Sequence, residues 1–218
     1  MRPAYLWFFF KVESATELSA ALVDAKSAGI RREGLNPDGL RGWSWGKLVF
    51  DEVTLSDDDF LGGVNCGLQI FRDHFLYYRP MVAATALGGA AAAFDNVVWQ
   101  IRQRLGSHTI DNCRDSALDI LARSYVSIHS CLLSALMAQV LVERGSSFAS
   151  LWSRGAKANS VETAVGIVSN LALLSGAMAY EENSAVGKIL NDLRGLLYAD
   201  GIQDALYRAV GRSIIREY

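Results

Sequence analysis

The sequence predicts an α+β protein that is mostly helical, with a small partial β-sheet followed by an antiparallel bundle of long helices. Apolar residues alternate in the first part of the chain, as in half-buried strands, and recur at three- and four-residue spacing from residue 64 onward, as in amphipathic helices. The change occurs across Lys47–Gly63, where the acidic run Asp57–Asp59 is typical of a turn that starts a helix. We therefore expect a partial β-domain over residues 1–62 and a helical bundle domain over residues 63–218.

Four segments are predicted as strands. The first is rich in aromatic residues, which favour strands, and turn-forming residues are concentrated between residues 27 and 46, as in hairpin loops. So few strands leave edges unpaired and one face uncovered, and the β part is expected to be incomplete by itself. The strands are expected at residues 4–11, 17–26, about 29–32 and 43–55, and the second of them could be partly helical.

Five helices are predicted after the junction. Gly88 and Gly89 each cost about 1 kcal/mol in the interior of the first helix, which indicates close packing there. Gly145 ends the second helix, and long helices joined by short loops form an antiparallel bundle. The helices are expected at residues 64–105, 111–143, 148–178, 185–197 and 202 to the C-terminus.

The composition excludes several classes of protein. A net charge of -2, with basic residues mixed among acidic ones, gives no basic stripe for nucleic acid. Three cysteines at unrelated spacings favour a reducing compartment, which predicts a cytoplasmic protein. Lys11 and Glu13 follow the apolar N-terminal run closely, so no signal peptide is expected. The uncharged run at residues 81–94 is too short to span a bilayer, so no membrane contact is expected.

The sequence lacks the common catalytic and metal-binding motifs. The three histidines, His74, His108 and His129, have no metal-ligand spacing with each other or with the cysteines, so no metal site is predicted. The sequence contains no G-x-S-x-G motif, no P-loop and no dinucleotide-binding G-x-G-x-x-G after a strand.

The junction and the helix after it carry motifs that resemble those of the C-terminal half of an acyl-CoA dehydrogenase. In that family a middle β-domain ends in a segment like FD.V.VP...LLG, and a long helix carries RP.VAA.A.G.A..A.D and then R..FG. Here Ser56 replaces the usual proline and Leu105 the usual phenylalanine. The matching residues are Phe50, Asp51, Val53, Leu61 and Gly62, then Arg79, Pro80, Val82, Ala83, Ala84, Ala86, Gly88 and Asp95, then Arg102 and Gly106.

Two further motifs near the C-terminus continue the resemblance. The family's GG.GY is similar to Gly176–Tyr180, and its YEGT.EIQ....AR is similar to the stretch from Asp200 and Gly201 to Gly211 and Arg212. The resemblance covers nearly the whole chain. The chain itself resembles only the second half of a family member, without the N-terminal helical domain and the first half of the β-domain.

The resemblance implies roles for particular residues. In the family a carboxylate removes the α-proton of an acyl thioester while a hydride leaves the β-carbon for the flavin. Asp200 stands at the position of the catalytic glutamate, with a side chain one methylene shorter. By the same resemblance the acyl group is bound by Phe75, Tyr78 and Arg79, and the cofactor by Arg102, Arg104, Gly176, Ala177 and Gly201.

Structural interpretations of the same residues stay open. Asp200 could instead be the N-cap of the last helix. Arg79 could be a surface residue beside aromatic packing, and Arg102 and Arg104 could form a solvated helix end that suits the helix dipole.

The cofactor and partners follow from the resemblance. FAD is expected, although Leu173, Cys113 and Ile202 stand where the family often has hydrogen-bonding side chains, and Ala177 and Ala179 add methyl groups. The substrate is expected to be an acyl thioester of CoA or of a carrier protein. The resemblance further implies a homo-oligomer, or a hetero-oligomer with a chain that supplies the missing N-terminal half.

Three functions are compatible with these observations. The leading hypothesis is an acyl-CoA dehydrogenase-like half or subunit that catalyses α,β-dehydrogenation with flavin at a subunit interface. The second is a cofactor-independent biosynthetic enzyme, a cyclase or isomerase, on a truncated scaffold of that family. The third is a non-catalytic partner subunit.

Overall fold

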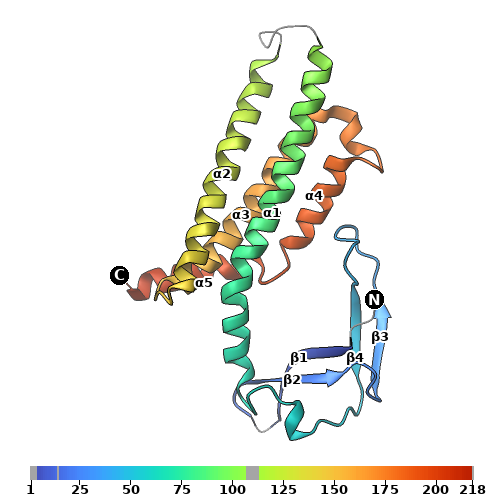
Figure 1. The fold of residues 1–218 in the computed structure, drawn as a ribbon, viewed down its shortest axis with the longest axis vertical. Coiled ribbons are helices and arrows are strands. Elements are labelled where there is room, and N and C mark those ends of the chain that lie inside the picture. Colours follow the sequence, from blue (N-terminus) through green and yellow to red (C-terminus); the bar gives the residue numbers. More distant parts are fainter. Residues whose placement is uncertain (1–3, 14, 107–112, 218) are drawn as a thin grey trace. The chain divides into compact units, whose positions relative to one another are not determined.

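A computed structural model describes residues 4–13, 15–106 and 113–217, and they form two compact units (Figure 1). Unit 1 lies within residues 1–37 and 42–75, and unit 2 within residues 38–41 and 76–218. The predicted domain boundary after residue 62 marks a change of secondary structure. The two units are instead divided by their internal contacts. The predicted boundary therefore stays a prediction.

Unit 1 contains two antiparallel strand pairs. Strand β1 (Tyr5–Lys11) pairs with β2 (Leu18–Asp24), and β3 (Ile30–Gly34) pairs with β4 (Gly46–Phe50). The four predicted strands are thus confirmed, but they form two separate pairs in place of one sheet. The last strand is shorter than predicted, because Glu52 has a positive φ of 51° that ends the extended backbone.

The acidic run forms a short 3₁₀ turn, η1 (Asp57–Asp59), ahead of the first long helix. The backbone N–H of Ser56 donates to Asp59 Oδ2 at 2.7 Å, and the Ser56 hydroxyl donates to the same oxygen at 2.8 Å. These hydrogen bonds lower the pKa of Asp59. The turn is therefore a capped unit of its own, and helix α1 (Gly67–Leu105) begins several residues later.

Unit 2 is an antiparallel helical bundle (Figure 1), as the sequence predicts. It contains most of α1 together with α2 (Asp115–Glu143), α3 (Ala149–Ser175), α4 (Ala185–Leu196) and α5 (Gln203–Glu217). A 3₁₀ turn, η3, follows α3 at Gly176–Tyr180. All five predicted helices are confirmed, and the predicted start of the second, at residues 111–112, lies outside the described residues.

The core of unit 2 is built from small residues of α1 and larger ones of α3 and α4. Gly89 lies against α4, where an added Cβ would stand 3.4 Å from Leu193 Cδ2, whereas a Cβ on Gly88 would meet nothing within 4 Å. The predicted close packing therefore holds for Gly89 alone. The fully buried members of the core are Ala86, Ala90, Ala93, Val97, Val161, Ala164, Val168 and Leu171, with Val186, Leu193 and Leu196 from α4 almost fully buried.

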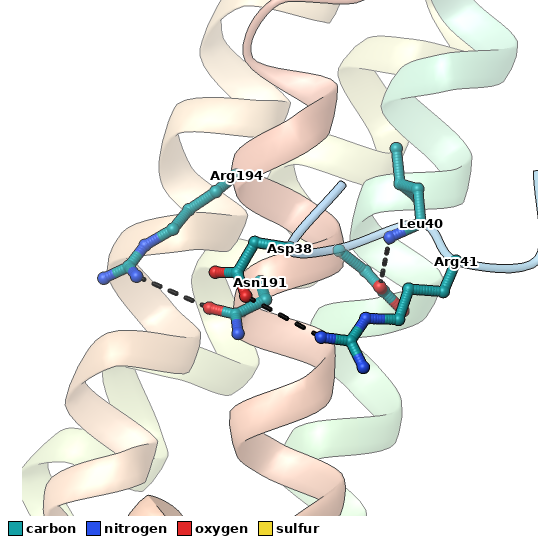
Figure 2. Close-up of polar contacts among 6 residues, drawn as sticks. Asp38, Leu40, Arg41, Asn191 and Arg194 are labelled. Atoms are coloured by element: carbon teal, nitrogen blue, oxygen red, sulfur yellow. Dashed lines mark hydrogen bonds and ion pairs between the residues drawn. The ribbon is translucent and has the colours of Figure 1, made fainter. Parts of the chain in front are cut away.

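Residues 38–41, predicted as part of a hairpin loop, are held on α4 (Figure 2). The backbone N–H of Leu40 donates to Asp192 Oδ1 at 2.6 Å, while Leu40 itself packs against the core. Gly195 leaves room for it, since a Cβ there would stand 2.8 Å from Leu40 Cδ1. A distant segment of the chain thus completes the bundle surface over α4.

Helix α1 contains Pro80 in its interior, where proline removes a backbone donor. The carbonyl that would accept from residue 80 is that of Leu76, four residues earlier. Ser153, fully buried at the start of α3, donates its Oγ to this carbonyl at 2.8 Å. A side chain from another helix therefore satisfies the acceptor that Pro80 leaves open, and α1 continues through the proline.

Three helical segments are long and apolar enough to cross a membrane by length and composition alone: Gly67–Leu105, Asp115–Glu143 and Ala149–Tyr180. At most 33% of each apolar window is buried within the chain. The exposed apolar side chains of α2 include Tyr125, Val126, Leu133, Leu136, Met137 and Val140. This surface is available to a partner chain, and the expectation that no membrane is bound stays a prediction.

Replacing Ser153 with alanine leaves the Leu76 carbonyl buried without its side-chain donor. We expect Ser153→Ala to lower the free energy of unfolding by about 1–3 kcal/mol, the cost of an unsatisfied buried acceptor. Urea denaturation followed by circular dichroism measures this. Ser169→Ala is the matched control, because Ser169 Oγ donates at 2.8 Å to Val165 O within its own helix. An equal loss in both variants would contradict the role given to Ser153.

Candidate functional site

The predicted acid, Asp200, lies in the turn between α4 and α5. Asp200 and Gly201 both have left-handed backbones, with φ of 53° and 109°. Helix α5 begins at Gln203, so Ile202 precedes it and Asp200 does not occupy the N-cap. The alternative that Asp200 caps the last helix is therefore wrong, because two left-handed residues turn the chain before the helix starts.

Two cations from different helices hold this turn by its backbone. Arg79 Nε of α1 donates to Asp200 O at 3.0 Å. Lys157 Nζ of α3 donates to Gly201 O at 2.6 Å and to Leu197 O at 3.4 Å. We call these three hydrogen bonds from Arg79 and Lys157 the carbonyl clamp.

The clamp places an excess of positive charge around one carboxylate. Burial lowers the pKa of Lys157 to about 8, while the charge of Asp200 raises that pKa and the charge of Arg79 lowers it. Burial and the charge of Arg154 lower the pKa of Arg79 to about 10, against the opposing effect of Asp200. Arg79, Arg154 and Lys157 thus form a basic cluster beside Asp200, and its excess positive charge favours additional negative charge on a bound molecule.

Lys157 is the residue that the sequence analysis missed. It is fully buried, and it lies in one helical stripe with Val161, Ala164 and Val168, which are also fully buried. A lysine in an apolar stripe at three- and four-residue spacing is the signal that could have identified it. Its partner carbonyls could not have been found, because they belong to a turn about forty residues away in the chain.

The other predicted substrate-binding residues lie on α1 before Arg79. Tyr78 is exposed and belongs to unit 2. Phe75 belongs to unit 1, where its ring lies 4.4 Å from that of Phe71 and 4.9 Å from that of His74. The structure therefore groups Arg79 with Asp200, and the roles of Tyr78 and Phe75 stay predictions.

Four of the five predicted cofactor-binding residues form a second group, at the C-terminal end of α1 and just after the C-terminal end of α3. Arg104 Nη1 donates to Leu174 O at 2.8 Å and Nη2 donates to Ser175 O at 3.2 Å, which brings Arg104 beside Gly176 and Ala177. Arg104 therefore caps α3 while it stays exposed, so the alternative of a solvated helix end stays open. Arg102 is exposed and makes no ion pair within the described part of the chain.

The two groups are far apart within unit 2. Arg79 and Arg104 are separated by nearly seven turns of α1, or roughly 37 Å at about 1.5 Å per residue. Gly201, also predicted to contact the cofactor, belongs with Asp200. The structure divides the predicted site residues between an acid group, formed by Arg79, Asp200 and Gly201 together with Lys157, and a distal group, formed by Arg102, Arg104, Gly176 and Ala177.

A pocket of about 290 Å³ adjoins the acid group. Gln203 Nε2 is buried there without an acceptor among the described residues, and Glu162 Oε2 accepts from the Tyr207 hydroxyl at 3.0 Å. Burial and this hydrogen bond raise the pKa of Tyr207 to about 12. The mostly apolar walls fit an uncharged part of a dinucleotide, whereas Glu162 repels phosphate. The lining consists of Glu162, Val165, Leu197, Tyr198, Ile202 and Gln203.

The helical part of the chain, from just before α1 into α5, matches a known protein family. A profile of the family described as acyl-CoA dehydrogenase, C-terminal domain, matches residues 65–215. The chain belongs to the acyl-CoA dehydrogenase family. The matched range begins just before α1 and includes the carbonyl clamp and the distal group.

Related proteins match this chain over nearly its whole length. Cyclohexane-1-carbonyl-CoA dehydrogenase of Geobacter metallireducens is 25% identical over 203 residues, which make up 92% of this chain and 53% of that protein. Butyryl-CoA dehydrogenase of Megasphaera elsdenii has a TM-score of 0.87 at 19% identity, over 97% of this chain and 55% of that one. PigA in complex with FAD has a TM-score of 0.89 at 17% identity, over 97% and 56%. The chain thus spans about half the length of these acyl-CoA dehydrogenase relatives.

Removing the charge of Asp200 should change the titration of Lys157. Because that charge raises the pKa of Lys157, we expect Asp200→Asn to lower it below its value of about 8. NMR titration of the lysine side-chain ¹³Cε signal measures the shift. Asp204→Asn is the control, since Asp204 pairs at 2.8 Å with Arg208 on the exposed side of α5. The same fall in both variants would show that the effect is not specific to Asp200.

The depressed pKa of Lys157 also predicts a pH dependence of stability. Between about 8 and 10.5, its ordinary value, the unfolded chain keeps a proton that the folded protein has lost, so the free energy of unfolding rises with pH. Lys157→Met lacks this contribution. The difference between wild type and Lys157→Met should therefore grow in favour of wild type over this range and stay constant below it. Urea denaturation at a series of pH values measures the difference, and a flat difference would contradict the assignment.

Proposed function

We propose that the chain supplies the C-terminal half of an acyl-CoA dehydrogenase-type active site, with Asp200 as the base that removes the α-proton of an acyl thioester. The observation that carries the proposal is the carbonyl clamp. It holds a carboxylate in an ordered turn among basic side chains, and the sequence resemblance aligns that carboxylate with the family's catalytic acid. The whole enzyme is proposed to include a second chain or a further copy.

The chemistry needs a base and a means to stabilise negative charge. Removing a proton next to a thioester carbonyl places negative charge on the carbonyl oxygen as the enolate forms. The positive charges of Arg79 and Arg154 favour such charge near Asp200. The short side chain of Asp200 requires the substrate to approach the turn closely, because misplacement by about 1 Å costs roughly 10²-fold in rate.

The proposal includes FAD at a subunit interface. When bound, the flavin would accept the hydride that leaves the β-carbon. Support comes from the mostly apolar pocket beside the acid group and from the similarity to PigA, which has been solved with FAD. The roughly 37 Å between Arg79 and Arg104 exceeds the length of an extended dinucleotide. We therefore infer that the acid group and the distal group contact flavins of different subunits.

The base function can be tested without flavin. The chain, alone and in the assembly in which it purifies from its source, is incubated in D₂O with butyryl-CoA and with a cyclic acyl-CoA, and loss of the α-proton is followed by ¹H NMR. We expect Asp200→Asn to slow exchange by about 10²-fold or more, the usual contribution of a positioned general base. Asp204→Asn should leave it unchanged. Equal exchange in Asp200→Asn and wild type would overturn the proposal.

The same samples separate the other two functions predicted from the sequence. Flavin absorbance that is bleached anaerobically by the acyl-CoA supports dehydrogenation. Exchange that depends on Asp200 in a flavin-free assembly points to the cofactor-independent enzyme. If an assembly with a longer family member shows no exchange and no bleaching, the result points to a non-catalytic subunit and contradicts our proposal.

A further inference from the structure

Lys157 is the largest fully buried side chain among the described residues, and the proposed chemistry does not use it directly. Burying an ammonium group is costly unless hydrogen bonds replace its hydration. Lys157 Nζ lies within hydrogen-bonding distance of two carbonyl oxygens, those of Leu197 and Gly201. The cost of burying this charge is therefore offset at one short turn.

That turn needs support from outside. Asp200 has a left-handed backbone, which costs an ordinary residue roughly 1 kcal/mol or more and persists only where surrounding contacts fix it. Gly201 also has a positive φ, and a Cβ there would stand 3.0 Å from Leu206 Cδ2. The backbone at Asp200 is thus strained, and its carboxylate direction depends on what holds the neighbouring peptides.

The clamp acts on both sides of the carboxylate. Lys157 binds the carbonyls of residues 197 and 201, which flank Asp200, and Arg79 binds the carbonyl of Asp200 itself. The two donors come from α3 and α1, so the turn cannot rotate without losing contact with at least one of them. Ser153, one turn before Lys157 on α3, holds α1 through the Leu76 carbonyl and so fixes the two helices together near Arg79.

We propose that Lys157 is a positioning residue that, together with Arg79, fixes the direction of the Asp200 carboxylate toward the substrate. The inference rests on the proposed function, in which Asp200 is the base. Lys157 does not touch substrate in this proposal. It acts through the backbone of the turn, and its loss should affect the rate of proton removal more than the binding of the thioester.

The test uses Lys157→Met, which keeps an unbranched apolar stem and removes the donors. In the α-proton exchange assay we expect kcat to fall by about 10²-fold, as for a displaced catalytic group, while KM changes less than about threefold. Combined with Asp200→Asn, Lys157→Met should cause no further loss, because a residue that acts through Asp200 has no effect once that carboxylate is gone. An equal loss with and without Asp200 would overturn the proposal.

A measurement that needs no activity separates this inference from the proposed function. Hydrogen exchange of the backbone amides in residues 197–203, followed by mass spectrometry, should accelerate by about tenfold in Lys157→Met. Lys188→Met is the matched control, since Lys188 is exposed and pairs at 2.5 Å with Asp192 on α4. Unchanged protection in Lys157→Met would overturn the clamp, whatever the activity. Faster exchange of the turn with no effect of Asp200→Asn on turnover would instead overturn the proposed function and the positioning role built on it.

If Lys157→Met fails to fold, a second variant keeps the proposal testable. Arg79→Gln removes the donor to Asp200 O from α1 and leaves Lys157 in place. We expect the same pattern, with faster amide exchange in the turn and a larger effect on kcat than on KM. An Arg79→Gln variant with wild-type turn protection and kcat would overturn the clamp.

Discussion

The face of α3 that carries Ser153 and Lys157 connects three parts of the bundle through buried hydrogen bonds. Ser153 satisfies the Leu76 carbonyl that Pro80 leaves without a backbone donor in α1. Lys157, one turn later, holds the loop between α4 and α5 at Gly201. Because a buried polar group is costly when it has no hydrogen-bond partner, the folded bundle depends on each of these contacts. The left-handed turn at Asp200 exists in this form because the helices around it are fixed in this way.

The charge distribution links that packing to chemistry. A bundle built mainly from alanine, valine and leucine offers a medium in which each charge acts strongly on its neighbours. The charge of Arg79 lowers the pKa of Lys157, the charge of Arg154 lowers the pKa of Arg79, and Asp200 raises both. In the distal group, by contrast, the guanidinium of Arg104 donates hydrogen bonds to the carbonyls that end α3. Both groups lie in a chain that spans about half the length of its acyl-CoA dehydrogenase relatives.

Most of the fold could be predicted from the sequence, because hydrophobic periodicity and turn residues are local signals. The spacing of apolar residues located every helix, and the aromatic alternation located β1. The site was harder to predict. The motif around Asp200 pointed to an acid, but its assignment as a possible helix cap was wrong, because the left-handed backbone of Asp200 is set by contacts with α1 and α3. Lys157 was missed although it stands in an apolar stripe, since periodicity shows that a position is buried and does not show what it binds.

The sequence by itself determined the order of strands and helices, the family resemblance and the identity of Asp200 as the candidate acid. These depend on residue type and spacing along the chain. Only the tertiary structure decided that residues 38–41 complete the surface of α4, that Ser153 compensates for Pro80, and that Lys157 and Arg79 hold the turn at Asp200. Each of these contacts joins segments far apart in the chain through hydrogen bonds with strict distances. Such bonds form only after the helices have packed, so no local pattern encodes them.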